Sequence, residues 1–292
     1  MTTDTEQFRA LGFSEQRLSA RRLSFALQTR DEQQTKILAL HGWLDNCASF
    51  LPLIPLFRDR ASLVVPDLAG HGLSEHRASG SYNVFDDAAD VIALADALGW
   101  KRFRIVGHSM GANIAVLVAG AWPARVERVA LLDGYGPFSA SVAETPARLA
   151  AGAAQLERMR DRPASEFESL EEAVQRYRQH RTGLSEDSAR LLLGRGAMEV
   201  EQGRLRLRHD PGRHAATLFR PTEEQVLAFL SAISCPVYAV RARSGWPVEE
   251  ELLQRRVRAI KDCRFVELDG YHHVHMDHPE RLQEMVDWLL AP

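Results

Sequence analysis

The sequence predicts an α/β fold with a mostly parallel sheet, because short apolar runs alternate with helical patterns along most of the chain. Apolar runs of strand length lie at residues 36–40, 62–65, 103–106, 126–132 and 237–240. The runs RIV and VALL are almost wholly apolar, which is typical of strands buried on both faces. Alternation of this kind indicates a sheet covered by helices on both sides.

The remaining elements of the sheet domain have their own local signals. Gly99 ends the first helical pattern, and Pro279 suits the first turn of the last helix. The further elements are expected, in chain order, as a hairpin at 17–29, a helix at 85–98, a buried helix at 112–121, a strand at 264–268 and a helix at 279–290. The sheet domain is therefore expected to comprise residues 1–135 and 223–292.

The alternation of strand and helix patterns stops between residues 136 and 222, where the chain is charged and has a helical pattern. A single strand-like patch, RLRLR, lies at residues 204–208. We expect a helical cap here, inserted after the carboxyl end of a strand, where open α/β sheets place their ligand sites. Glu side chains interleave with its arginines at helical spacing, which favours a solvated face. These arginines are Arg148, Arg158, Arg160, Arg162, Arg176, Arg178 and Arg181.

Composition narrows the class of protein. The chain has 292 residues, of which 45% are hydrophobic and 26% charged, enough for a large buried core. A net charge of −3 gives no basic footprint for nucleic acid. Cys47, Cys235 and Cys263 show no CxxC spacing and are expected to be reduced thiols. With no apolar leader and no run of about 18 apolar residues, we expect a cytoplasmic monomer or homodimer away from membranes.

A nucleophile motif stands between a predicted strand and a predicted helix. Gly107, Ser109 and Gly111 form the pattern G-x-S-x-G, in which the serine is exposed on a sharp turn at the sheet edge. The following helix points its N-terminus at the serine and favours developing negative charge there. The Met110 N–H is therefore a predicted oxyanion donor. The loop His41-Gly42-Trp43 follows another strand, and we expect its Trp43 N–H to be the second donor.

The histidine that would activate the serine is expected near the C-terminus, in GYHHVHMDHPE. Four histidines compete there, namely His272, His273, His275 and His278. Histidine and aspartate at short spacing can also bind zinc. One catalytic histidine with surface neighbours explains the cluster more simply, so we expect no metal and no organic cofactor.

The motifs HGW, VPDLAGHGLS, GHSMG and G-Y-H-x-x-H-M-x-x-P-E resemble those of the α/β-hydrolase superfamily over nearly the whole chain. More narrowly, HGWLDNCASF, LLDG and HHVHM are similar to the serine hydrolase-like proteins. The resemblance implies an eight-stranded, mostly parallel sheet flanked by helices, with the cap inserted after the sixth strand. It also implies that His272 is the base, with His273 as the fallback, and that His275 is structural.

The triad acid departs from the family pattern. The superfamily usually supplies it in a G-x-x-D sequence after the strand that follows the cap, and that position is Gly245 here. Asp133, at the end of the strand before the cap, is the favoured replacement. Glu249 or Glu250 reaching back from the next helix is a second possibility, and a Ser–His dyad or an inactive site is a third. Asp67 and His71, in VPDLAGHGLS, are expected to be structural.

The expected function is that of a serine hydrolase acting through Ser109, His272 and Asp133 on an ester or thioester of a small apolar acyl group. Trp43, Phe138 and Trp246, with His108 and Asp45, are expected to shape the pocket for this acyl substrate. The same resemblance also covers C–C bond hydrolases and cofactor-free haloperoxidases. A catalytically weak small-molecule-binding protein is the non-enzymatic alternative.

Overall fold

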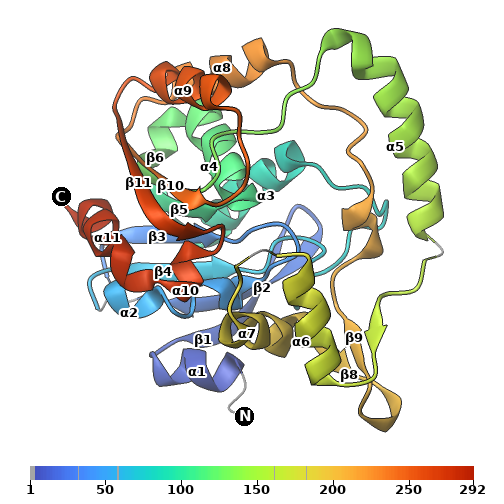
Figure 1. The fold of residues 1–292 in the computed structure, drawn as a ribbon. Coiled ribbons are helices and arrows are strands. Elements are labelled where there is room, and N and C mark those ends of the chain that lie inside the picture. Colours follow the sequence, from blue (N-terminus) through green and yellow to red (C-terminus); the bar gives the residue numbers. More distant parts are fainter. Residues whose placement is uncertain (1–3, 32, 58, 161, 182) are drawn as a thin grey trace.

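A computed structural model describes residues 4–31, 33–57, 59–160, 162–181 and 183–292. Its main sheet has eight strands in the order β1-β2-β4-β3-β5-β6-β10-β11 (Figure 1). These are β1 (Ser14–Ala20), β2 (Leu23–Arg30), β3 (Lys36–Leu40), β4 (Ser62–Pro66), β5 (Phe103–His108), β6 (Val126–Leu132), β10 (Val237–Ser244) and β11 (Cys263–Tyr271). Strand β2 is antiparallel to both of its neighbours, and the other pairs are parallel. The expected mostly parallel, eight-stranded sheet is confirmed.

Helices cover both faces of this sheet. In chain order, the helices in the described residues are α1 (Asp4–Ala10), α2 (Ile54–Phe57), α3 (Val84–Ala97), α4 (Met110–Ala121), α5 (Thr145–Arg160), α6 (Leu170–Gln179), α7 (Glu186–Gly196), α8 (Glu223–Ala232), α9 (Glu250–Ala259), α10 (Val274–Asp277) and α11 (Gln283–Leu290). Of these, α5, α6 and α7 belong to the segment between β6 and β10 and do not cover the main sheet. Alternate residues of β3 show the two layers. Leu38 and Leu40 pack in one apolar cluster with α3, α4 and α8, whereas Ile37 and Ala39 pack in another with α1, α2 and α11. The strands are therefore buried on both sides, as their apolar runs predicted.

Two expectations for the ends of the chain are incomplete. Helix α1 carries no long apolar pattern, and the sequence analysis assigned no element to it. The predicted last helix at 279–290 divides into a short 3-10 turn, Pro279–Leu282, and α11, with α10 before both. Among the helices in the described part of the chain, none has the length and apolar character needed to cross a membrane.

The segment between β6 and β10 contains more strand than expected. Strands β7 (Glu166–Phe167), β8 (Ala197–Glu199) and β9 (Leu205–Leu207) form a separate three-stranded sheet. The segment is helical, with α5, α6 and α7, but the expectation of a single strand patch was wrong. Two or three residues give no measurable alternation, so only the patch around β9 was visible in the sequence.

Two buried arginines attach this inserted segment to the sheet domain. The Arg195 side chain donates from Nε to Asp67 Oδ2 at 2.8 Å and from Nη1 to Asp4 and Glu15 at 3.0 and 2.8 Å. Arg213 donates to Asp87 Oδ2 at 3.0 Å. The segment is thus joined to the domain largely through charge-assisted hydrogen bonds.

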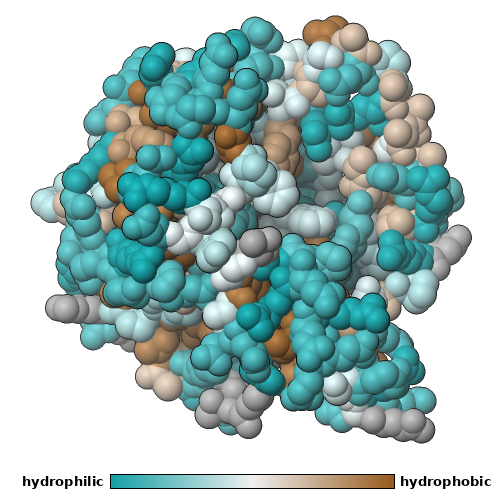
Figure 2. Space-filling model, viewed as in Figure 1, coloured by the Kyte–Doolittle hydropathy of each residue, from teal (hydrophilic) through white to brown (hydrophobic). Residues whose placement is uncertain are grey.

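Of the seven arginines that were expected to face solvent, Arg158, Arg160, Arg162, Arg176 and Arg178 are exposed, whereas Arg148 and Arg181 are partly buried. In Figure 1, α5 stands at the right-hand edge of the molecule, away from the main sheet. Arg148 and Arg160 on this helix pair with Glu144 and Glu157 of the same segment. Figure 2 shows this face of the molecule as mostly hydrophilic, with paler brown along α5.

Candidate active site

Ser109 occupies the sharp turn between β5 and α4. Its φ of 52° and ψ of −114° lie in a region that side chains rarely adopt, which is the strain expected of a nucleophile turn. The two motif glycines allow close backbone contacts. A Cβ atom at Gly107 would lie 2.4 Å from the Gly111 carbonyl oxygen, and one at Gly111 would lie 1.9 Å from the Leu40 carbonyl oxygen. The G-x-S-x-G pattern is therefore required by packing.

Ser109, His272 and Asp133 form a continuous chain of hydrogen bonds. His272 lies immediately after β11, and its Nε2 is 2.9 Å from Ser109 Oγ. Its Nδ1 is 2.5 Å from Asp133 Oδ2. Since a carboxylate can only accept, Nδ1–H donates to Asp133 and Nε2 is free to accept the serine proton. The structure thus brings the three expected residues into the geometry of a catalytic triad.

Asp133 lies directly after β6 with its carboxylate buried. It accepts hydrogen bonds from the backbone N–H groups of Ala242 at 3.2 Å and Trp246 at 2.9 Å. Burial alone would raise the pKa of Asp133. The hydrogen bond and charge of His272, together with the two backbone donors, outweigh burial and lower that pKa. The carboxylate is therefore held ionised beside the imidazole.

Gly245 leaves room for the Asp133 carboxylate. A Cβ atom at this position would lie 2.2 Å from Asp133 Oδ2, so the Asp133 carboxylate fills the space that a side chain at 245 would need. The alternative acids do not reach the histidine. Glu250 instead bonds Arg241 at 2.6 Å, and Glu249 lies at the start of α9. Within the described chain, the carboxylate in contact with His272 is that of Asp133.

The two expected oxyanion donors are the first residue of α4 and a residue of the loop after β3. Met110 opens α4, so its N–H has no acceptor within the helix. The loop of Trp43 is held by His41, whose Nε2 accepts from the Leu68 N–H at 2.9 Å. The Trp43 indole N–H donates to the Arg213 carbonyl at 2.9 Å, which ties this loop to the inserted segment. Both donors therefore lie in pre-organised backbone.

Asp45 and His108 were expected to shape the substrate pocket, but neither of them presents its side chain at the surface. Both side chains are buried in a cluster of histidines beneath the triad. His108 Nε2 donates to the His272 carbonyl at 2.9 Å, and His273 Nε2 lies 3.2 Å from Asp45 Oδ2. His273 is therefore directed away from Ser109, while His275 is fully buried, as its expected structural role requires.

Electrostatics keep this cluster in defined charge states. Burial lowers the pKa of His108 to about 4, although the nearby carboxylate of Asp45 acts in the opposite direction. Burial would raise the pKa of Asp45, but His273, His108 and Arg181 together hold it well below its usual value. A neutral His108 thus stands beside an ionised Asp45. The histidines of HHVH were visible in the sequence, but nothing there predicted that His108 and Asp45 pack against them.

Two of the three expected aromatic pocket residues lie beside the triad at the surface. Phe138 and Trp246 are each 53% exposed, and their ring centroids are 6.3 Å apart. The Trp246 ring lies 5.8 Å from that of His272. This arrangement offers an apolar surface next to the base.

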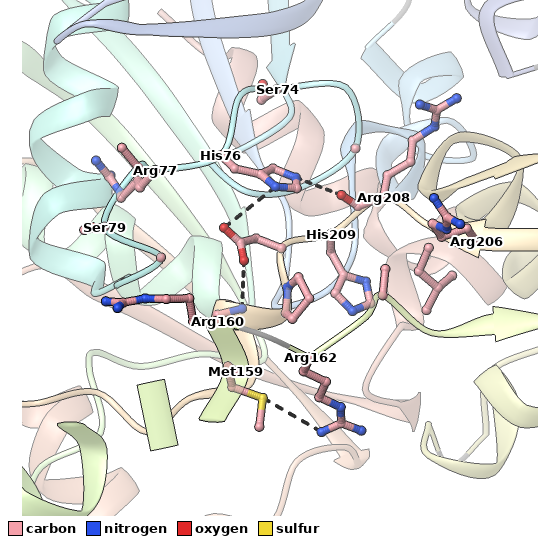
Figure 3. A pocket seen from close by; sticks show the side chains of 18 of the residues that line it. Ser74, His76, Arg77, Ser79, Met159, Arg160, Arg162, Arg206, Arg208 and His209 are labelled. Atoms are coloured by element: carbon pink, nitrogen blue, oxygen red, sulfur yellow. Dashed lines mark hydrogen bonds and ion pairs between the residues drawn. The ribbon is translucent and has the colours of Figure 1, made fainter. Parts of the chain in front are cut away.

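A cavity of about 650 Å³ lies farther from the triad, between the loop 72–80, the end of α5 and residues 206–212. Figure 3 shows His76 and Ser74 on one side of it and Arg160 and Arg162 on the other. None of the three triad residues lines it. His209 lies in its wall, and the adjoining turn Pro211–His214 separates the cavity from Trp43. Its cationic side chains are those of Arg17, Arg77, Arg160, Arg162, Arg206 and Arg208.

Comparison with known proteins was consistent across sequence and structure. The sequence model of the α/β hydrolase fold family matches residues 36–279. The chain is 33% identical over 266 residues to a serine hydrolase-like protein of Danio rerio, covering 88% of this chain and 81% of the relative. It is 30% identical to the 2-(acetamidomethylene)succinate hydrolase of Mesorhizobium japonicum, covering 81% of each chain.

Solved structures show the same fold. A hypothetical protein from Pseudomonas aeruginosa PAO1 superimposes with a TM-score of 0.86 at 34% identity, covering 94% of this chain and 98% of that one. The thioesterase domain from the curacin biosynthetic pathway superimposes with a TM-score of 0.82 at 23% identity, covering 94% and 99%. At that identity the second likeness concerns the fold alone.

Proposed function

Because this chain belongs to the α/β-hydrolase fold family, we propose that it is a serine hydrolase that cleaves an ester or thioester of a small, largely apolar acyl group. The observation that carries the proposal is the hydrogen-bonded chain from Ser109 through His272 to Asp133. A relative named as a serine hydrolase-like protein and another named as a hydrolase support the same class. Fold alone would not justify this step, because one fold serves many functions.

The proposed reaction follows from which atoms can move protons. Ser109 Oγ attacks the acyl carbonyl carbon while His272 Nε2 takes its proton. Asp133 stabilises the resulting imidazolium, and the Met110 and Trp43 N–H groups stabilise the oxyanion. His272 then gives the proton to the leaving alcohol or thiol. A water molecule, deprotonated by His272, finally hydrolyses the acyl-enzyme at Ser109.

We propose that the apolar acyl group lies against Phe138 and Trp246, which lie next to the base. The segment 136–222 acts in this account as a cap over the site. Supporting this role, the Tyr177 hydroxyl of α6 donates to the Leu44 carbonyl at 2.6 Å, directly after Trp43 in the oxyanion loop. Movement of the cap would therefore displace the backbone next to the Trp43 N–H.

We also propose that the protein functions in the cytoplasm. Cys47 and Cys235 are buried free thiols, and Cys263 is a partly buried free thiol. Free thiols are typical of reducing compartments. Fractionation of the source cells, followed by detection of the protein, would test this assignment.

The proposed function is tested by turnover of a p-nitrophenyl butyrate ester and of a butyryl thioester. We expect a burst of one leaving group per chain, with a mass increase of one butyryl group at Ser109. Ser109→Ala abolishes both, whereas the control Ser141→Ala, at an exposed serine, changes neither. Hydrolysis that persists in Ser109→Ala would contradict the proposal. Absence of an adduct with both acyl donors would favour the C–C hydrolase, haloperoxidase or binding-protein alternatives.

A further inference from the structure

In the buried histidine cluster beneath the triad, one ring nitrogen of His108 has no hydrogen-bond partner in the described structure. His108 Nε2 faces a carbonyl oxygen, which can only accept, so this nitrogen carries the proton. In a neutral imidazole the other nitrogen, Nδ1, then carries a lone pair. This Nδ1 is buried without a hydrogen-bond partner in the described structure, and it faces Asp45 Oδ2 at 3.5 Å. Two electron-pair donors thus face each other in the interior.

A third donor completes the group. His273 Nε2 lies 3.2 Å from the same Asp45 Oδ2, while Arg181 approaches the other oxygen, Oδ1, at 3.8 Å. The ligand atoms of Asp45, His108 and His273 all lie within 4.8 Å of one another, and all three residues are buried. Among the residues that the structure describes, this is the group of three possible metal ligands whose ligand atoms lie that close together.

The distances suit a particular class of ion. Tetrahedral zinc with ligand bonds of 2.0–2.2 Å separates its nitrogen and oxygen ligands by about 3.4 Å. The two shorter edges of the cluster, 3.2 and 3.5 Å, bracket that value. Two imidazoles and a carboxylate are ligands that zinc and similar divalent transition ions accept. The absence of a side chain at Gly42 leaves space here, since a Cβ atom there would lie 2.7 Å from Asp45 Oδ2 and 2.9 Å from His108 Nδ1.

We propose that Asp45, His108 and His273 form a binding site for a zinc-like divalent transition ion. Each ligand is a close neighbour of one part of the triad region. Asp45 follows Trp43 by two residues, His108 directly precedes Ser109, and His273 directly follows His272. A bound ion therefore links the oxyanion loop, the nucleophile turn and the loop of the base. It does so without contacting the reacting atoms, so its ligands are positioning residues.

The site is tested on protein stripped with a chelator, by titration with zinc chloride and measurement of bound metal after gel filtration. We expect one zinc ion per chain and a higher thermal unfolding midpoint with zinc. Asp45→Asn and His273→Gln lose the bound ion and the midpoint shift. The matched control is His214→Gln, because His209 and His214 form another close histidine pair, with Nε2 atoms 3.0 Å apart. This control keeps both effects.

Two results would overturn the proposal. One is zinc binding that survives in His273→Gln or disappears in His214→Gln, and the other is no stoichiometric binding by the wild-type chain. If the wild-type chain binds no zinc, the contact between His108 Nδ1 and Asp45 would instead be explained by a proton on Nδ1. Because the variants alter the interior, cobalt(II) titration of the wild-type protein gives an independent test. We expect the intense absorption of a tetrahedral nitrogen and oxygen site, and the weak spectrum of a hydrated ion would overturn the proposal.

Discussion

The carboxyl edge of the sheet and the inserted segment between β6 and β10 are stabilised in different ways. At the edge, strand ends and close backbone contacts place Ser109 and Asp133, both at positive φ. The inserted segment is attached by buried guanidinium groups, above all that of Arg195. Substitutions at the edge should therefore act on chemistry, and substitutions at the attachment should act on stability. The predictions below test that division, beginning with the largest expected effect.

Ser109→Ala removes the nucleophile and should lower kcat for butyryl ester hydrolysis by about 10⁶-fold. The urea midpoint of unfolding should change little. The Ser109 hydroxyl loses only its hydrogen bond with His272, and it does not cap helix α4. Steady-state kinetics and urea denaturation check the two parts. A large loss of stability with retained turnover would break the division between the regions.

Asp133→Asn should lower kcat by about 10⁴-fold, because an amide no longer holds His272 in the required tautomer. Moving the acid sharpens this test. Gly245→Asp alone should be destabilising, since its Cβ lies 2.2 Å from the Asp133 carboxylate. The double variant Asp133→Gly/Gly245→Asp should recover part of the activity. A double variant no more active than Asp133→Asn would show that a carboxylate at position 245 cannot replace that of Asp133.

Arg195→Met should lower the free energy of unfolding by about 3–5 kcal/mol, because Asp4, Glu15 and Asp67 would keep their charges without the guanidinium group that neutralises them. Urea unfolding followed by circular dichroism measures the change. The control is Arg190→Met on the same helix, whose pair with Glu186 at 2.8 Å lies near the surface, so a much smaller loss is expected. Equal losses in the two variants would contradict the role assigned to Arg195.

Acid should lower the free energy of unfolding through two buried histidines in the loops that follow β3 and β4. His41 and His71 are fully buried, and burial lowers the pKa of both. The unfolded chain binds protons at these histidines near pH 6.5, whereas the native chain does not, so stability is lost as pH falls below that value. Each should contribute about 1.4 kcal/mol for every pH unit until its native pKa is reached.

Urea unfolding between pH 8 and pH 5 measures this slope. His71→Asn should reduce it by the contribution of one histidine, while the exposed His180→Asn should leave it unchanged. An unchanged slope in His71→Asn would show that His71 already binds a proton in the native state. The hydrogen bond from the Leu44 N–H to His71 Nε2 at 3.2 Å argues for the neutral form.

The sequence predicted the edge better than the attachment, and the reason is physical. Residues such as Ser109 and Asp133 follow strands whose apolar runs are visible without the structure, so their convergence at one edge could be inferred. The partners of Arg195 are 128 to 191 residues away in the chain, and nothing local distinguishes it from the exposed arginines around it. The burial of His108 and Asp45 was missed for the same reason, because it depends on how three loops pack.

The central claim is that Asp133, supplied by β6, completes an active triad with His272 and Ser109. The most direct test is the rate of fluorophosphonate labelling, with the modified residue identified by mass spectrometry. We predict labelling at Ser109 in the wild-type chain, none in Ser109→Ala, and labelling slowed by orders of magnitude in Asp133→Asn. Normal labelling of Asp133→Asn would contradict the claim, as would a folded wild-type chain that does not react.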